Sequence, residues 1–233
     1  MIYCIGDSFT AGDELSDWSP KFDPETEPYP ISKFAWPSLL EQKLNQPVKN
    51  LGRGGCGNTR IVKRAMDATL MGADMVIVAW ATPLRLELAD EFGVFDVWPN
   101  RNISVMAHDD IRGMLVKWFT VHHDGEEEKY EQWYYAAWLR QIVLLQSFFK
   151  TNNQRYLMMT SDPMHYRNKK YQQQFNKLYS QIDPTYFVGW PTHSMQDWAH
   201  GLPKGPYCHF LEEGHQRVAD EVYEHIRRLG WIS

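Results

Sequence analysis

The chain has 233 residues and a formal net charge of −5 at pH 7. This length suits one α/β domain with a substantial core. The negative charge argues against a nucleic-acid partner, whose phosphates are held by clustered Lys and Arg side chains. The sequence has no run of about 18 apolar residues, so we expect no membrane span. The three cysteines, an odd number, fit a reducing compartment better than a disulfide framework.

The amino terminus enters an apolar segment at once, without the basic and then apolar leader of a secreted protein. We therefore expect synthesis and folding in the cytoplasm and leave the final location open. No Cys-x-x-Cys or His-Glu-x-x-His spacing predicts a metal site. No Gly-x-Gly-x-x-Gly follows the first strand, and the glycine-rich stretch at 52–57 lacks the Lys-Ser or Lys-Thr of a P-loop, so we expect no cofactor.

Apolar periodicity and turn residues predict alternating strands and helices. In chain order these are a strand at 1–5, a helix at 35–45, a strand at 47–51, a helix at 58–71, a strand at 74–80, a helix at 130–150, a strand at 155–160, a helix at 167–181, a short strand at 186–189 and a helix at 212–229. In the 130–150 helix, a helical period predicts a face formed by Trp133, Ala137, Leu144 and Phe148. Residues 91–129 do not fit the alternation, and we interpret them as an insertion within a single domain spanning 1–233.

Alternating strands and helices imply right-handed crossovers and a doubly wound, three-layer α/β/α sandwich. The nearly continuous apolar run at 74–80 is typical of a parallel strand covered on both faces. In such sheets, ligands bind beyond the carboxyl ends of the strands, where the strand order reverses. Ser8, the glycine-rich loop at 52–55 and the segment 80–82 are all predicted at such ends.

The segment Gly6-Asp7-Ser8 directly follows the first apolar run. At the carboxyl end of a strand, on a tight turn into a helix, a serine hydroxyl faces the crevice and its backbone N–H points at the group that the hydroxyl attacks. The alternative is an ordinary strand-to-turn corner that uses Gly and Asp for their turn geometry.

His209 precedes the last predicted helix, in which Val218, Val222 and Ile226 recur at four-residue spacing. A loop at this place can fold back over the carboxyl end of the first strand. Ser8 and His209 then have the ingredients of a nucleophile and its general base. The alternative is that His209 is a surface or capping residue.

These segments resemble the SGNH (GDSL-type) hydrolase family, which carries Gly-Asp-Ser near its amino terminus and a His-Pro-Asn-x-x-Gly-His block near its carboxyl terminus. Here His209 is followed at the same spacing by Gly214-His215, and the stretch from Asn50 to Gly55 is similar to the family's second block. The resemblance implies a flavodoxin-like parallel sheet of about five strands in the order 2-1-3-4-5. It also implies an oxyanion hole that includes the N–H groups of Ser8 and Gly55.

The family's third block, Gly-x-Asn-Asp, is absent, because the stretch 79–85 contains no Asn. Asn58 is one candidate for the missing oxyanion donor, and helix N-capping is the alternative for this residue. Thr82 is a second candidate, because the third strand is predicted to end beside it.

The family's acid, three residues before the histidine, is also absent, because Pro206 stands there. Asp197 is the nearest carboxylate on that side, and we consider it as the group that orients His209. A main-chain carbonyl is the alternative.

The resemblance therefore implies a serine-dependent ester hydrolase that needs no metal or organic cofactor. Several members of that family deacetylate carbohydrates, so the resemblance also implies a carbohydrate O-acetyl ester as substrate. Because aromatic faces are the usual platform for sugar rings, four of the 10 Trp are candidate platforms: Trp18, Trp98, Trp190 and Trp198. Core packing is the alternative for each of these residues. Two other functions stay open: a binding or structural module that kept the fold and lost activity, which the missing Asn and Asp favour, and an acyltransferase that uses the same Ser and His.

Overall fold

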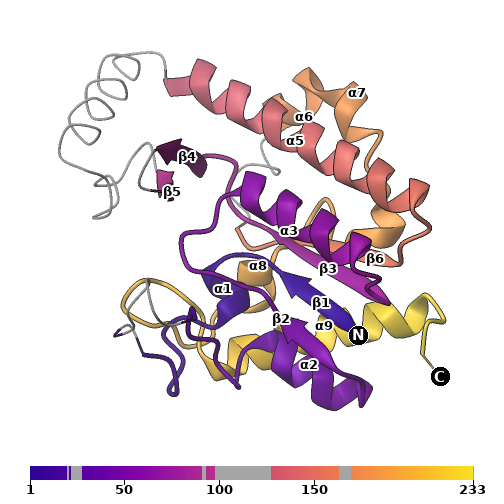
Figure 1. The fold of residues 1–233 in the computed structure, drawn as a ribbon. Helices are drawn as coiled ribbons and strands as arrows, with labels where there is room; N and C mark the ends of the chain where they lie inside the picture. The colour runs from indigo at the N-terminus through magenta and orange to yellow at the C-terminus, as the bar shows by residue number, and fades with distance from the viewer. Residues whose placement is uncertain (20, 22–27, 91–92, 98–126, 163–168, 233) are drawn as a thin grey trace.

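Four parallel strands form the centre of the computed structural model, which describes residues 1–19, 21, 28–90, 93–97, 127–162 and 169–232. The strands are β1 (Ile2–Ile5), β2 (Val48–Asn50), β3 (Met75–Trp80) and β6 (Tyr156–Thr160), in the order β2-β1-β3-β6 (Figure 1). All neighbouring pairs are parallel. The strands β3 and β6 are buried along their whole length, which confirms strands covered on both faces.

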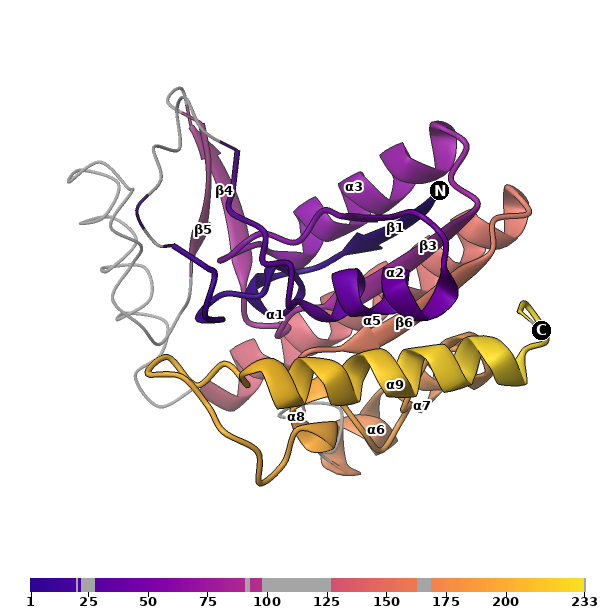
Figure 2. The same ribbon diagram turned by 90° about the horizontal axis from the view of Figure 1, so that it is seen from below.

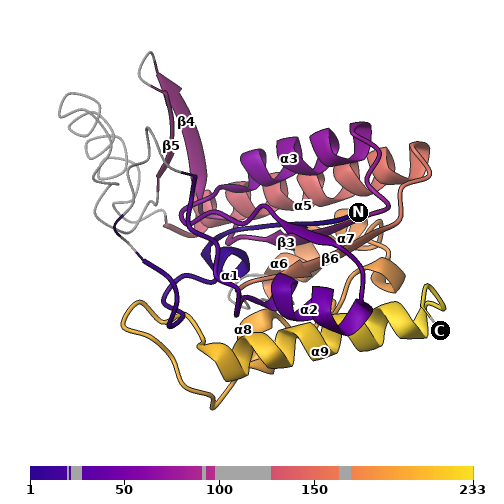
Figure 3. The same cartoon turned by 60° about the horizontal axis from the view of Figure 1, so that its bottom comes forward.

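Two layers of helices cover the sheet. One face is covered by α3 (Asn58–Leu70) and α5 (Glu127–Thr151), and the other by α2 (Trp36–Leu44) and α9 (Glu212–Arg228) (Figures 2 and 3). A separate apolar cluster fills each space between helices and sheet. The predicted α/β/α sandwich and the order of its first four strands are confirmed.

The course of the chain across the sheet reverses at β1. From β1 the chain passes through α2 to β2 on one side, and it then returns through α3 to β3 on the other side of β1. Such a reversal leaves a crevice beyond the carboxyl ends of the two strands between which it occurs. The segments that follow β1 and β3 border this crevice.

The predicted inner face of the α5 helix is wrong in part. Trp133 and Leu144 are 63% and 68% exposed, whereas Tyr135, Ile142 and Phe149 are buried. The helix carries apolar residues at helical spacing on two faces, and Phe149 and Ile142 belong to the face that packs on the sheet. Periodicity alone cannot choose between two apolar stripes.

Three other predicted elements differ from the structure. The segment 186–189 is not a strand: the 3-10 helix η1 (Pro184–Tyr186) enters it, and only a single parallel bridge joins Phe187 to Met158. The helix predicted at 167–181 is described as two short helices, α6 (Lys169–Gln174) and α7 (Asn176–Tyr179). The strand β4 (Leu86–Asp90), just before the predicted insertion at 91–129, pairs antiparallel with β5 (Gly93–Val97) inside it.

The rest of that region, 98–126, lies outside the described residues, as does 163–168 at the start of the predicted helix. Within the part of the chain that is described, no helix combines the length and the apolar character needed to cross a bilayer.

Candidate active site

Ser8 is the first residue of α1 (Ser8–Ala11), a single helical turn after β1. Asp7 caps this turn, because its Oδ1 accepts a hydrogen bond from the amide two residues further on, at 3.1 Å. Gly6 permits the close approach that the turn requires, since a Cβ there would lie 2.2 Å from Thr10 Oγ1. The sequence thus builds a tight strand-to-helix turn with the serine at its top.

The Asp7 carboxylate also ties together the loops around the turn. Its Oδ1 accepts from Ser161 Oγ at 3.1 Å, and its Oδ2 lies 3.3 Å from an Arg85 guanidinium nitrogen. The same Arg85 nitrogen donates to the Cys56 carbonyl at 3.1 Å. Both side chains of the ion pair are almost fully buried, at 2% and 4% exposed, so removal of one charge would deprive the other of a buried partner. The segments after β1, β3 and β6 are therefore held at fixed positions around Ser8.

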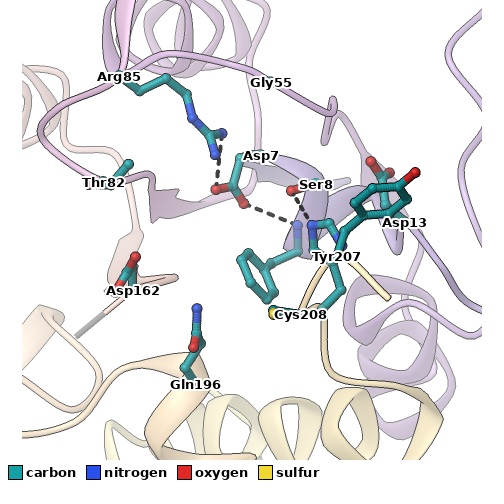
Figure 4. A pocket seen from close by; sticks show the side chains of 12 residues that line it. Asp7, Ser8, Asp13, Gly55, Thr82, Arg85, Asp162, Gln196, Tyr207 and Cys208 are labelled. Carbon is teal, nitrogen blue, oxygen red and sulfur yellow. Dashed lines mark hydrogen bonds and ion pairs between the residues drawn. The ribbon is translucent and has the colours of Figure 1, made fainter. Parts of the chain in front are cut away.

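His209 lies on the loop between α8 (Met195–Trp198) and α9. Its Nε2 is 2.7 Å from Ser8 Oγ, the contact that a dashed line marks beside Ser8 in Figure 4. The Phe9 ring packs edge-on against the imidazole, with the ring centroids 4.7 Å apart. The Gly205 amide donates to the His209 carbonyl at 2.8 Å and closes the loop. The structure thus brings together the serine and the histidine that the sequence singles out.

Glu14 lies behind the imidazole. Its Oε2 is 2.7 Å from His209 Nδ1, and its carboxylate also accepts from the backbone amides of Tyr207, at 2.9 Å, and of His209, at 3.2 Å. The Glu14 side chain is 5% exposed. Glu14 has a φ of +69°, which is uncommon for a residue other than glycine and is typical of functional sites. A carboxylate at Nδ1 favours the tautomer with the proton on Nδ1, in which Nε2 can accept a hydrogen bond from Ser8 Oγ.

Asp197, which the sequence analysis considers as the orienting acid, does not contact His209. Its Oδ2 instead accepts from Ser194 N and Ser194 Oγ, both at 2.8 Å, and forms the capping box of α8. The family pattern places the acid just before the histidine, whereas Glu14 lies six residues after Ser8. The one signal that points to Glu14 is its closeness in sequence to Ser8, because a residue just after the α1 turn stays near that end of the sheet.

Two backbone amides can hold an oxyanion at Ser8. Gly55 lines the same cavity as Ser8 and has a φ of +75°, which glycine adopts without strain. Within the described residues no hydrogen bond uses the amide of Ser8 or of Gly55. The loop is held by Asn50, whose Nδ2 donates to the Thr10 carbonyl at 2.7 Å and whose Oδ1 accepts from Gly52 N at 2.8 Å.

The two side-chain candidates for a further donor differ in the structure. Asn58 Nδ2 already donates to the carbonyls of Ala81, at 3.2 Å, and of Thr82, at 3.1 Å, so this amide is occupied. Nor does Asn58 cap its helix, since Gly57 is the N-cap of α3. Thr82 lines the cavity, and its buried Oγ1 has no hydrogen-bond partner among the described residues. Thr82 is therefore placed where a third donor can act.

A cavity of about 290 Å³ opens beside Ser8. In Figure 4, Asp13 and Tyr207 lie on one side of Ser8, and Thr82 and Asp162 lie on the other. Asp13 is 8% exposed and its Oδ2 accepts from the Tyr29 hydroxyl at 2.6 Å. Burial raises the pKa of Asp13 to about 6.

The tryptophans proposed as sugar platforms do not line this cavity in the described part of the chain. Trp190 and Trp198 border a separate cavity of about 570 Å³, together with Arg217 and His225. Trp18 is half-buried. Trp98 lies outside the described residues.

His215, which matches the last residue of the family pattern, supports the fold instead of the chemistry. Its Nδ1 accepts a hydrogen bond from the Trp36 amide at 3.1 Å, at the start of α2. Its ring packs against Phe210 with a centroid distance of 4.6 Å. Complete burial lowers the pKa of His215 to about 3, so the ring is neutral at pH 7 and can accept.

The site has the components of acyl transfer through a serine: a hydroxyl, an oriented imidazole and backbone donors. Of the three cysteines, Cys4 and Cys56 are buried, and Cys208, the neighbour of His209, is exposed. In the described part of the chain, no group of three His, Cys, Asp or Glu side chains can hold a metal ion.

No family model matches this sequence, and no curated protein matches it. Several solved structures are similar to it. The acetyl xylan esterase Est2A of Butyrivibrio proteoclasticus is similar over 99% of this chain and 64% of its own length, at 13% identity and a TM-score of 0.54. A carbohydrate esterase family 2 enzyme of Corynascus thermopiles (Myceliophthora fergusii) covers 99% of this chain and 66% of its own, at 15% identity and 0.52.

The esterase EstA of Pseudoalteromonas sp. is similar over 99% of this chain and 98% of its own length, at 14% identity and a TM-score of 0.50. The chain thus spans about two thirds of the two carbohydrate esterases and almost all of EstA. At these identities the likeness concerns the fold. The chain has the SGNH (GDSL-type) fold that these esterases share.

Proposed function

We propose that the protein is a serine-dependent ester hydrolase. The observation that carries the proposal is the continuous chain of contacts from Ser8 through His209 to Glu14, with 2.7 Å at both junctions. A buried carboxylate at positive φ behind an imidazole orients a general base, and a binding module without catalysis does not need this arrangement. Structural neighbours that are esterases support the reaction class.

In the proposed reaction, Ser8 Oγ attacks the acyl carbon and His209 Nε2 takes the Ser8 proton. The amides of Ser8 and Gly55, with Thr82 Oγ1, donate to the oxyanion. The protonated His209, stabilised by the Glu14 carboxylate, then gives its proton to the leaving alcohol, and an acyl group stays on Ser8. Water, deprotonated by His209, attacks this acyl group, and the acid leaves as Ser8 regains its proton.

The cavity favours a small acyl ester, because about 290 Å³ is just below the roughly 300 to 1,000 Å³ of small-molecule sites. Two of the similar structures are carbohydrate esterases, which makes an acetylated carbohydrate the first substrate class to examine.

Hydrolysis of 4-nitrophenyl acetate tests the proposal. We expect turnover by the wild-type protein and its loss in Ser8→Ala, with Cys208→Ser as the matched control, since Cys208 lines the same cavity and is the other nucleophile at hand. Equal rates for wild type and Ser8→Ala would refute the proposal. Absence of turnover in the folded wild type would also do so and would favour a binding module.

A further inference from the structure

Two polar side chains line the cavity and have hydrogen-bonding capacity that the described residues leave unused. Asp13 Oδ1 has no hydrogen-bond partner there, although its Oδ2 is bonded to Tyr29. The Gln196 side-chain amide has none either, and Figure 4 shows it directed from α8 towards the centre of the cavity. Neither group has a role in the proposed proton transfers.

The two groups are held by independent parts of the fold. Asp13 follows the α1 turn, which ends at Gly12, and the hydroxyl of Tyr29 fixes one of its oxygens. Gln196 lies in α8, which the Ser194 capping box closes. The backbone N–H of Gln196 donates to the Ser161 carbonyl at 3.4 Å, and the Ser161 side chain in turn contacts Asp7. The backbone of both residues is therefore held in place beside the cavity.

Leaving an acceptor such as Asp13 Oδ1 buried without a partner destabilises the fold, and more strongly when the group is charged. This atom is closed to solvent. The terminal torsion of an aspartate is broad, so a modest rotation can turn the oxygen towards a ligand in the cavity. A ligand that supplies a hydroxyl there recovers the missing hydrogen bond.

The charge of the cavity narrows the ligand class. Among the described residues, its wall carries the carboxylates of Asp7 and Asp13 and the guanidinium of Arg85, which is paired with Asp7. An excess of negative charge disfavours an anionic substrate. Carboxylate and carboxamide groups instead suit neutral ligands that carry several hydroxyls.

The position of Asp13 indicates which part of the ester it meets. His209 gives its proton to the leaving alcohol, so the alcohol must lie on the His209 side of Ser8. Asp13 is close enough to His209 for their charges to interact, and Figure 4 places it opposite Thr82, on the far side of Ser8. Asp13 therefore lies on the alcohol side of the cavity.

We propose that Asp13 forms a specificity subsite that binds a hydroxyl group of the leaving alcohol, and that Gln196 bonds a further hydroxyl from another wall of the cavity, so that the preferred substrates are esters of polyhydric alcohols. This inference rests on the proposed ester hydrolysis and adds to it two residues that select the alcohol. A site built to bond a hydroxyl discriminates strongly against an alcohol that lacks it, because its own polar groups then stay unpaired.

The test compares two acetyl esters of matched length, monoacetylglycerol and propyl acetate. We expect the wild type to prefer monoacetylglycerol in kcat/KM. Asp13→Asn should reduce this preference about tenfold or more, and Gln196→Ala about fivefold, since hydrogen bonds to charged groups contribute more than neutral ones. The controls are Asp17→Asn and Gln216→Ala, whose side chains bond to Ser32 and Asp220 and do not line the cavity.

A wild type without preference would overturn the inference, as would variants that slow both esters by the same factor. If Asp13→Asn does not fold, Gln196→Ala alone decides. If the wild type hydrolyses 4-nitrophenyl acetate but shows no preference between the two esters, the inference fails and the proposed function stands. If it hydrolyses no ester, both fall.

Discussion

Replacing Asp13 by Asn should change how the stability of the protein depends on pH. Burial raises the pKa of Asp13 from 3.8 to about 6, so above pH 6 the folded state carries a carboxylate that the unfolded chain would hold at lower cost. The difference of about 2.2 between these values, at about 1.36 kcal/mol for each pH unit, corresponds to roughly 3 kcal/mol. The wild type bears this cost at neutral pH, and an uncharged Asn does not.

The direction follows from proton binding. Between about pH 6 and 3.8 the folded wild type binds the Asp13 proton and the unfolded chain does not, so the wild type gains stability relative to Asp13→Asn as the pH falls through this range. The cost of burying an amide N–H in place of an oxygen is the same at every pH. The difference between the variants therefore isolates the ionisation.

Urea unfolding of both proteins at a series of pH values measures this difference. We expect the free energy of unfolding of Asp13→Asn, relative to wild type, to fall by more than roughly 2 kcal/mol between about pH 7.5 and pH 4. Asp17→Asn is the control, because Asp17 is exposed and does not line the cavity. A difference that stays constant across the range would refute the account of Asp13 as a buried carboxylate with a raised pKa.

Three further substitutions test the site itself. Glu14→Gln keeps the size of the side chain but removes the charge that fixes the His209 tautomer, so we expect kcat for 4-nitrophenyl acetate to fall by about 10,000-fold with little change in KM; a loss of less than tenfold would contradict this role. Gly205→Ala would place a Cβ 2.7 Å from the Glu14 carboxylate and push it away from His209, so we expect kcat in the same assay to fall at least roughly tenfold. Full activity of this variant would mean that the carboxylate need not stay in place. Thr82→Val removes the hydroxyl without changing the shape of the side chain, and we expect a loss of roughly 100-fold in kcat in steady-state kinetics. An unchanged kcat would mean that Thr82 lines the cavity but does not donate to the oxyanion.

Much of the fold can be predicted from the sequence, because parallel strands such as β3 and β6 are continuous apolar runs and the helices between them have clear ends. The buried face of α5 cannot, because that helix has two apolar stripes and only packing selects one. The segment at 186–189 looks like a strand from its composition, but it forms one bridge instead of a ladder.

The sequence also predicts some residues of the candidate site and misses another. Ser8, Gly55 and His209 can be predicted, since each lies in a short motif with a fixed place relative to a strand end or a helix start. Glu14 cannot be found by spacing, because it meets His209 across 195 positions of sequence through the folding of two loops.

The central claim is that Ser8 is an activated nucleophile, and labelling with a fluorophosphonate probe tests it most directly. The probe reacts with a serine hydroxyl only where a base withdraws its proton and donors hold the developing charge. We predict one adduct, located on Ser8 by mass spectrometry, that is absent in Ser8→Ala and strongly slowed in Glu14→Gln. A folded wild-type protein that gains no adduct on Ser8 would contradict the claim.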